Sequence, residues 1–221
     1  APARTDGSSD LSYFEEGLNE ILSVLQPNSI VINKSTVPLG TAKKLQEDIE
    51  RTDVHVVSNP EFLSEGNAIR DFLEPSRIVI GANSREHSER VAKLYSRLNA
   101  PILVSSWESA ELIKHTANAF LAMKLTFVNE IATLCEISGA DIKDVTDGIG
   151  YDPRIGSDYM SAGPGWGGSC FPKVSASLAQ VARSFGFDFT LLEHTIDLNQ
   201  KHLDRTAEKV QRLVPTGSPH R

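Results

Sequence analysis

Cys170 is the residue whose surroundings most favour chemistry. It follows two glycines and a serine, and it precedes Phe171, Pro172 and Lys173. Pro172 suits the first position of a helix, which places Cys170 just outside a helix N-terminus. The helix dipole, the N–H groups of the first turn and the Lys173 ammonium all favour a thiolate there. The pattern predicts a nucleophilic cysteine, and the alternative is a buried cysteine beside a turn.

Lys114 and Asn118 form a second candidate pair. They are four residues apart in a segment with helical periodicity, so they lie on one face of a helix. Asparagine is a poor helix former, and an ammonium beside a carboxamide can hold a substrate hydroxyl or stabilise an oxyanion. A solvated polar face would show the same spacing, and that alternative stays open.

Glu61 and Glu65 stand just past the end of a predicted strand. Open α/β sheets bind ligands at the carboxyl ends of their strands, and paired carboxylates there can act as general acid and base. Ser35 and Thr36 follow an earlier strand in the same way. The alternative is that these glutamates are ordinary surface residues of a loop.

The other cysteine and the histidines carry no such pattern. Cys135 lies on the apolar stripe of a helix, where a thiol packs as a small apolar group. Its separation of 35 positions from Cys170 gives neither a disulfide framework nor a metal-ligand spacing, so no metal is expected. The histidines without ligand-like spacing, which we expect to be structural or solvated, are His55, His87, His115 and His194.

Composition excludes several classes of function. The 221 residues include 22 Lys and Arg against 29 Asp and Glu, a formal net charge of −7. An acidic chain without a basic block argues against nucleic acid as the main partner. No apolar run approaches the roughly 18–20 residues of a membrane span, and no signal-peptide pattern opens the chain. We therefore expect a cytoplasmic protein without a membrane partner.

The N-terminal part of the chain alternates strands and helices. Short apolar runs predict strands at residues 29–33, 54–57, 77–81 and 102–104, and helical periodicity predicts helices at 11–25, 41–51 and 86–98. Strands separated by helices indicate βαβ units and a mostly parallel sheet. No Gly-x-Gly-x-x-Gly follows any of these strands, so the usual dinucleotide fingerprint is missing.

A different pattern begins at residue 106. Residues 107–138 contain no proline or glycine, and their apolar residues predict one helix of about 30 residues, roughly 45 Å long. That length favours a domain connector or a dimer spine. Further helices are predicted from residue 141, at 172–185 and at 190–213, with a loop at 151–168 and a frayed tail at 214–221. The expected fold is α/β, a partial Rossmann-like parallel sheet joined by the long helix to an all-helical dimerisation domain.

Five motifs occur in one order over nearly the whole chain. They are Lys34-Ser35-Thr36-Val37-Pro38, Asn59-Pro60-Glu61-Phe62-Leu63-x-Glu65-Gly66, Glu111-x-x-Lys114-x-x-x-Asn118, Arg154-Ile155-Gly156 and Gly167-Gly168-Ser169-Cys170-Phe171-Pro172-Lys173. In these motifs the chain resembles the UDP-glucose/GDP-mannose dehydrogenase family. That family oxidises the C6 alcohol of a nucleotide sugar to a carboxylate with two NAD and one water.

The resemblance implies a domain organisation and a set of ligands. Residues 1–105 would be the C-terminal portion of an NAD-binding Rossmann-like domain, and residues 106–213 a central helical domain for dimerisation and catalysis. NAD would be the cofactor, a nucleotide sugar (UDP-glucose in the first place) the substrate, and a second copy of the chain the partner through the long helix.

The resemblance also assigns catalytic roles. Cys170 matches the nucleophile that traps the C6 aldehyde as a thiohemiacetal, which is oxidised to a thioester and hydrolysed. Lys114 and Asn118 match the pair that stabilises the oxyanion, and Lys114 is also a candidate proton acceptor for the alcohol. Glu61 matches a general acid–base residue of the hydrolytic stage, and Thr36 a residue that positions water and touches the cofactor.

The remaining matches concern binding. The implied cofactor contacts are Ser35, Thr36, Val37, Glu65 and Lys173. The implied substrate contacts are Glu61, Phe62, Leu63, Glu65, Lys114, Asn118, Arg154, Tyr159, Ser161, Gly165 and Gly167, with Arg154 reaching the substrate of the partner subunit.

Two departures from the family pattern bear on activity. Val174 stands where the family has an aspartate that belongs to the proton-transfer network around water and the C6 oxygen. Loss of a positioned acid–base group typically costs about 10²–10⁴ in rate. Relative to the family, the chain also starts inside the Rossmann domain and stops before the nucleotide-binding domain.

The expected function is therefore a nucleotide-sugar 6-dehydrogenase whose isolated chain turns over little or nothing. The alternatives are a non-catalytic dimerisation or binding module, or a 6-dehydrogenase of GDP-mannose or of a UDP-N-acetylhexosamine. β-Hydroxyacid dehydrogenases also carry a Lys and an Asn four apart on a long helix, but they lack the cysteine motif and rank lower.

Overall fold

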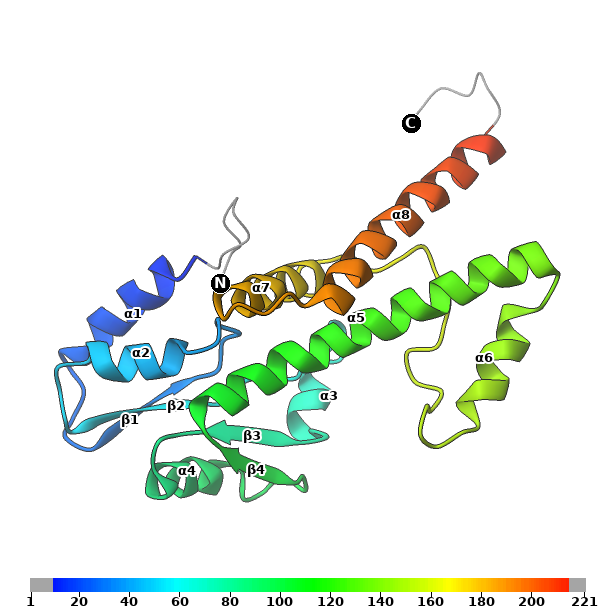
Figure 1. The fold of residues 1–221 in the computed structure, drawn as a ribbon. Helices are drawn as coiled ribbons and strands as arrows, with labels where there is room; N and C mark the ends of the chain where they lie inside the picture. The colour runs from blue at the N-terminus through cyan, green and yellow to red at the C-terminus, as the bar shows by residue number, and fades with distance from the viewer. Residues whose placement is uncertain (1–9, 215–221) are drawn as a thin grey trace. The chain divides into compact units, whose positions relative to one another are not determined.

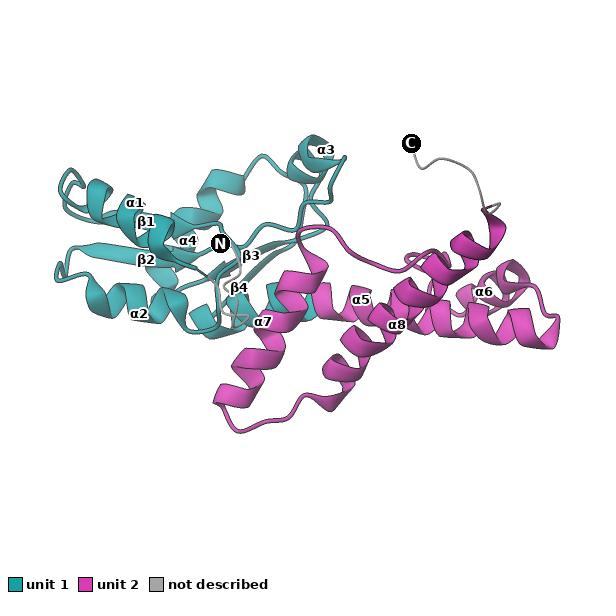
Figure 2. Cartoon of the chain, turned by 90° about the horizontal axis from the view of Figure 1, so that it is seen from above, with its two compact units in different colours: residues 1–117 teal, residues 118–221 magenta. Residues whose placement is uncertain are grey.

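The computed structural model describes residues 10–214. They form two compact units, divided between residues 117 and 118, which Figure 2 shows in different colours. The predicted frayed tail at 214–221 lies, except for Val214, outside the described residues.

The first unit contains a four-stranded sheet in the order β1-β2-β3-β4 (Figure 1). The strands are β1 (Ser29–Asn33), β2 (Val54–Ser58), β3 (Ile78–Gly81) and β4 (Ile102–Ser105). β1 pairs parallel with β2, and β3 with β4, so the predicted mostly parallel sheet is confirmed.

The β2–β3 pair is antiparallel and is formed by Ser58 and Gly81. Because β3 runs opposite to β2, the connection at residues 59–77 leaves and re-enters the sheet on the same side, where β2 ends and β3 begins. This side of the sheet has the carboxyl ends of β1 and β2 together with the amino end of β3.

Helices cover both faces of the sheet (Figure 1). They are α1 (Ser12–Leu22), α2 (Thr41–Asp48), α3 (Ala68–Leu73), α4 (Arg85–Ala92) and the 3₁₀ helix η1 (Lys93–Tyr95). Val54 and Val56 of β2 pack with α1 and α2, whereas Val57 packs with Val91 of α4. Burial on both faces explains why the strands are apolar runs.

The long helix α5 (Trp107–Ser138) begins against this sheet, with the predicted bounds. The Trp107 Nε1–H donates a hydrogen bond of 2.9 Å to the Val56 carbonyl. At Gly81, a Cβ atom would lie 2.6 Å from the Ala110 Cβ. Only glycine therefore permits the close approach of β3 to the first turns of α5.

The second unit is helical in the part that the structure describes. Besides the rest of α5 it contains α6 (Ile142–Gly150), α7 (Phe171–Ser184) and α8 (Thr190–Leu213). Ala119 of α5, Leu178 and Ala179 of α7 and Leu192 of α8 form its apolar core.

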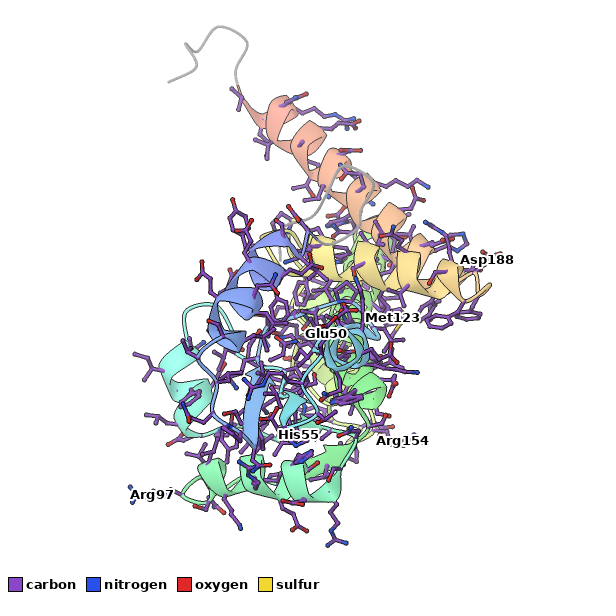
Figure 3. All side chains as sticks on the ribbon, turned by 90° about the vertical axis from the view of Figure 1, so that its left-hand side faces the viewer. Glu50, His55, Arg97, Met123, Arg154 and Asp188 are labelled. Atoms are coloured by element: carbon purple, nitrogen blue, oxygen red, sulfur yellow. The ribbon has the colours of Figure 1, made fainter. Side chains whose placement is uncertain are left out.

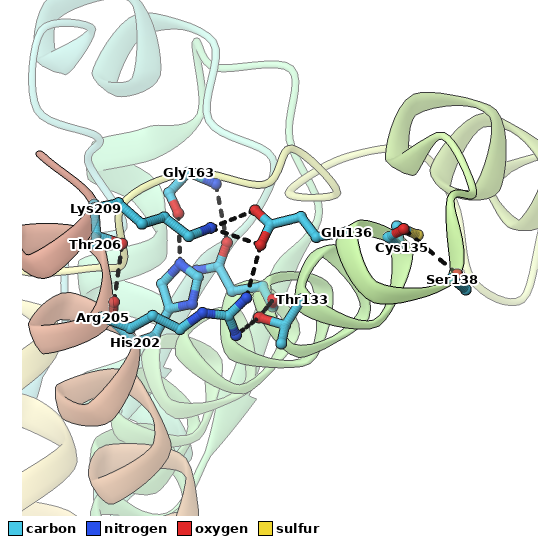
Figure 4. A network of polar contacts seen from close by, with 10 residues as sticks. Thr133, Cys135, Glu136, Ser138, Gly163, His202, Arg205, Thr206 and Lys209 are labelled. Atoms are coloured by element: carbon cyan, nitrogen blue, oxygen red, sulfur yellow. Dashed lines mark hydrogen bonds and ion pairs between the residues drawn. The ribbon is translucent and has the colours of Figure 1, made fainter. Parts of the chain in front are cut away.

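A polar network also joins α5 to α8 (Figure 4). Glu136 forms ion pairs with Arg205 at 2.7 Å and with Lys209 at 2.5 Å, and Arg205 also bonds Thr133.

Within residues 10–214, no helix combines the length of a bilayer span with the hydrophobicity that a span requires.

Candidate functional site

A buried lysine meets a carboxylate at the carboxyl end of β2. The Nζ of Lys114 lies 3.3 Å from Oε1 of Glu61, and the two side chains are 8% and 33% exposed. Burying an ammonium is costly unless it is paired, so Glu61 stabilises Lys114 in this position. The other carboxylate oxygen accepts a hydrogen bond of 2.7 Å from the Leu63 N–H, which fixes the direction of the Glu61 side chain.

Two cations lie against the ring of Phe62. The Arg77 guanidinium carbon is 3.8 Å from the ring centroid, and the Lys114 Nζ is 5.3 Å from it. The electron-rich face of an aromatic ring attracts cations at these distances. Burial lowers the pKa of Arg77. Glu61, Phe62 and Lys114, three of the predicted substrate contacts, are thus in mutual contact.

Asn59 anchors the start of the segment that carries Glu61. Its Nδ2 donates to the Val79 carbonyl at 2.8 Å, and its Oδ1 accepts from the Lys34 Nζ at 3.1 Å. The Tyr95 hydroxyl also donates to this oxygen. Since Asn59 is buried, these bonds satisfy its amide and hold the segment to the sheet.

The segment after β1 is held by a buried glutamate of α5. The Glu111 carboxylate accepts hydrogen bonds from the N–H groups of Gly40 at 2.6 Å and Ala42 at 2.8 Å, at the N-terminus of α2. Burial raises the pKa of Glu111 to about 7, although the N–H groups of Ala42 and Gly40 act to lower it. The carboxylate therefore fills the capping position at the start of α2.

His115 holds the same segment at a second point. Its Nε2 lies 2.8 Å from the carbonyl oxygen of Val37, and its ring is buried. Glu111 and His115 thus hold the chain that follows β1, and Lys114 between them meets the chain that follows β2. A single turn of α5 joins both predicted ligand-binding segments of the first unit.

A pocket of about 620 Å³ lies beside β1 in the first unit. Its walls combine apolar residues of α1 and β1 with Asn33, Lys34 and Ser35. The Asn33 Oδ1 accepts the Ser35 N–H at 3.0 Å, while its buried Nδ2 has no hydrogen-bond partner among residues 10–214. A buried donor without an acceptor is costly, so this amide favours a bound acceptor group.

Cys170 in the second unit is exposed and occupies the N-cap position of α7. Its carbonyl accepts the Val174 N–H at 2.9 Å, and its Sγ lies 3.6 Å from the Ser169 Oγ. The predicted place at a helix N-terminus is confirmed, and the alternative of a buried thiol is wrong. Pro172 falls at the second helical position rather than the first because the helix already begins at Phe171.

Two asparagines anchor the loop that leads to Cys170. The Asn129 Oδ1 accepts the Gly163 N–H at 2.9 Å, and Asn199 bonds both the N–H and the carbonyl of Trp166 at 2.8 Å. Gly165 has φ +118°, and a Cβ there would lie 3.0 Å from the Asn199 Oδ1. Neither asparagine belongs to a motif named above, although an asparagine inside a helix is itself a signal of a specific role.

The other predicted site residues make fewer contacts. Arg154, labelled in Figure 3, is exposed and forms an ion pair of 2.6 Å with Asp152. The remaining exposed ones are Ser35, Leu63, Glu65, Tyr159, Ser161 and Gly167, and the half-buried ones are Thr36, Asn118 and Lys173. No sequence pattern marked Arg77, and Glu111 was named within a motif but given no role.

The chain is similar to known proteins of one family. Residues 1–99 match the NAD binding domain of the UDP-glucose/GDP-mannose dehydrogenase family, and residues 108–201 match the central domain of the same family. UDP-glucose 6-dehydrogenase TuaD of Bacillus subtilis (strain 168) is 42% identical over 214 residues, 95% of this chain and 46% of the relative. UDP-glucose 6-dehydrogenase of Rhizobium meliloti (strain 1021) is 45% identical over 216 residues, 94% of this chain and 49% of the relative.

A solved structure extends the comparison to the fold. The UDP-glucose dehydrogenase of Pyrobaculum islandicum superposes with a TM-score of 0.86 at 36% identity, over 96% of this chain and 51% of that chain. The chain spans about half the length of the curated relatives it matches. Because two domains of one family match it in chain order, the chain belongs to the UDP-glucose/GDP-mannose dehydrogenase family.

Proposed function

We propose that the chain supplies the catalytic residues of an NAD-dependent 6-dehydrogenase that converts UDP-glucose to UDP-glucuronate. The observation that carries this proposal is the contact of the buried Lys114 with the half-buried Glu61 at the carboxyl end of β2. A buried amine and carboxylate in contact are suited to proton transfer. Relatives named UDP-glucose 6-dehydrogenase support this choice of nucleotide and sugar.

The first oxidation removes a proton and a hydride from the C6 alcohol. In its neutral form the Lys114 amine accepts the hydroxyl proton, and as an ammonium it stabilises the oxygen anion together with the Asn118 carboxamide. Glu61 holds the amine in place during this exchange. NAD, when bound, would supply the hydride acceptor, and two NAD molecules would be needed because each accepts one hydride.

The second oxidation proceeds on Cys170. Its thiolate adds to the C6 aldehyde to form the oxyanion of a thiohemiacetal, and loss of the C6 hydride from this anion leaves a thioester. Glu61 takes a proton from the attacking water, whose oxygen bonds to C6 as the thiolate of Cys170 leaves. Covalent capture keeps the reactive aldehyde on the protein between the two oxidations.

The first unit has residues that suit the dinucleotide. Asn33, whose buried Nδ2 has no hydrogen-bond partner among residues 10–214, lines a pocket beside β1, and open α/β sheets bind such cofactors at the carboxyl ends of their strands. Ser35 lines the same pocket and Thr36 follows it in the chain, so both are available to bind polar groups of NAD. The α5 contacts of Val37 and Gly40 hold this segment in place.

The exposed face of α5 supports a homodimer. Phe120, Phe127 and Leu134 recur every seven residues and are 57%, 54% and 57% exposed. Side chains at this spacing share one face of a helix. An apolar row of this length on a single helix suits the same row on a second copy of the chain.

The experiment that tests the function measures the reaction products and compares the effects of replacing each of the two cysteines. A full-length protein that contains this chain, with Val174→Asp to restore the missing carboxylate, is incubated with UDP-glucose and NAD. We expect two NADH per UDP-glucuronate by absorbance and mass spectrometry. Cys170→Ala should abolish UDP-glucuronate formation, whereas the control Cys135→Ala, which changes a buried packing residue, should retain it. Absence of UDP-glucuronate with Cys170 and the carboxylate both present contradicts the proposal.

A further inference from the structure

We propose that Arg77 is a positioning residue of this site, whose guanidinium stacks on Phe62 and thereby fixes Glu61 against Lys114. Its part in catalysis rests on the function proposed above, but its mechanical effect on the segment after β2 does not. Arg77 belongs to none of the motifs that carry the family resemblance.

The strand register brings Arg77 and Phe62 together. β2 and β3 pair antiparallel through Ser58 and Gly81. Phe62 lies four residues after β2, and Arg77 is the residue just before β3, so both stand near this pair of strands. The hydrogen bond of 2.8 Å from the Asn59 Nδ2 to the Val79 carbonyl ties the segment to β3.

The segment from residue 59 to residue 67 contains no helix or strand, and its backbone bonds the Asn33 carbonyl only at its first residue, through the Asn59 N–H, so side-chain contacts hold much of the rest. Asn59 holds its first residue to the sheet, and further on the Ser64 N–H donates to the Asp71 Oδ2 at 2.8 Å. Between these two points stand Glu61 and Phe62. The Arg77 guanidinium carbon lies 3.8 Å from the centroid of the Phe62 ring, so this contact supports the segment between its two ends.

The chemistry of Arg77 suits this task. Burial lowers its pKa, which marks a guanidinium that has lost part of its water. A partly desolvated guanidinium gains more from an aromatic face than an exposed one, and its planar group can lie flat on the ring. Lysine carries the same charge but cannot stack in this way.

The position of the ring determines the position of the acid–base pair. Phe62 directly follows Glu61, and its centroid lies 5.3 Å from the Lys114 Nζ. A ring that loses Arg77 can shift within its pocket and carry the Glu61 carboxylate away from the amine. Small displacements of catalytic groups have large effects on rate.

The test compares Arg77→Lys and Arg77→Ala with Arg85→Lys and Arg85→Ala in the 221-residue chain. Arg85 is a matched control because its side chain is 90% exposed and forms an ion pair with Glu89. Two measurements need no activity. Amide hydrogen exchange reports opening of residues 59–67, and acetylation mapped by mass spectrometry reports access to Lys114.

We expect both Arg77 variants to raise exchange in residues 59–67 and acetylation of Lys114 about tenfold, while the Arg85 variants match the wild type. Guanidinium at low millimolar concentration should reverse the effect in Arg77→Ala by occupying the vacated place, and sodium chloride should not. Unchanged exchange and acetylation in Arg77→Lys, or equal effects of both salts, would overturn the proposal.

A kinetic measurement separates this inference from the proposed function. In the Val174→Asp background, Arg77→Lys should lower kcat for UDP-glucose oxidation about tenfold and leave KM for NAD unchanged. A general loss of folding would instead change both constants. If no variant oxidises UDP-glucose, the proposed function fails, and the exchange and acetylation results alone decide the role of Arg77.

Discussion

At the scale of single residues, the buried ammonium of Lys114 depends on one carboxylate. We expect Glu61→Gln to lower the free energy of unfolding by about 1–2 kcal/mol, because it leaves the ammonium buried against a neutral amide. This is less than a fully buried pair would lose, since Glu61 is 33% exposed and water screens the contact. Urea unfolding at neutral pH measures the change.

Two further variants separate this pairing from a general effect of removing a charge. Glu86→Gln, an exposed change on α4, should leave the midpoint of unfolding where it is. Lys114→Met combined with Glu61→Gln should recover part of the lost stability, because no charge is then buried. Equal destabilisation by Glu61→Gln and Glu86→Gln would show that the contact contributes nothing.

We expect Val174, which replaces the family's aspartate, to lower the rate of UDP-glucuronate formation strongly. Its side chain is 4% exposed in the first turn of α7, four residues after Cys170. Val174→Asp should raise the rate of UDP-glucuronate formation by about 10²–10⁴, the usual contribution of a positioned acid–base group. The same change should lower the free energy of unfolding by about 1–3 kcal/mol, because it buries a carboxylate.

Val174→Asn distinguishes proton transfer from packing. Asparagine has nearly the shape of aspartate but accepts no proton at neutral pH. A rate gained by aspartate and not by asparagine supports the missing base, as measured by product formation with mass spectrometry. Equal rates for valine, asparagine and aspartate would mean that this position plays no part in the reaction.

At the scale of elements, the first turns of α5 hold the segment after β1 through a carboxyl group that titrates near neutrality. The pKa of Glu111 is raised from 4.5 to about 7, mainly by burial. The folded state therefore binds this proton more tightly than the unfolded state. The contribution of Glu111 to stability is fully present below pH 4.5 and is lost as the pH rises to about 7.

Glu111→Gln removes this titration. We expect the difference in free energy of unfolding between wild type and variant to change by about 1–3 kcal/mol across that range, in favour of the wild type at low pH. Burial lowers the pKa of His87. Groups of this kind titrate in both proteins, so their effects cancel in the difference. Urea unfolding at several pH values measures it, and parallel pH profiles would contradict the prediction.

Most elements follow from sequence pattern, and the exceptions have physical reasons. α5 and α8 have the predicted bounds because long apolar stripes without proline or glycine specify helices clearly. α3 was missed because its six residues include none that is buried, so no amphipathic pattern marks it. The antiparallel β2–β3 pair could not be predicted, since residues 59–77 are long enough to connect strands in either direction.

The site is predictable as residue types but not as contacts. Motifs marked Glu61, Lys114 and Cys170 as candidates, yet spacing along the chain could not reveal that Glu61 and Lys114 touch. Their contact arises from the start of α5 packing on β3 at Gly81. Arg77 lay outside every motif because its role depends on strand register, which a single sequence does not contain.

At the scale of the whole molecule, the proposed homodimer gives a prediction that involves neither substrate nor cofactor. We expect light scattering at tens of micromolar protein to give about twice the 24.1 kDa of one chain. Phe127→Glu should give the monomer mass. In a twofold-symmetric interface each substitution occurs twice, so two charges would enter one apolar contact.

Leu94→Glu is the matched control, because Leu94 on η1 is 68% exposed and lies outside the α5 row. It should leave the mass of the assembly unchanged.

Arg154 adds a functional consequence, since it is exposed and is proposed to reach the substrate of the partner subunit. Phe127→Glu should therefore lower UDP-glucose oxidation in the Val174→Asp background together with the mass, and Leu94→Glu should lower neither. A wild-type chain that remains monomeric at this concentration would contradict the role of α5 as a dimer spine.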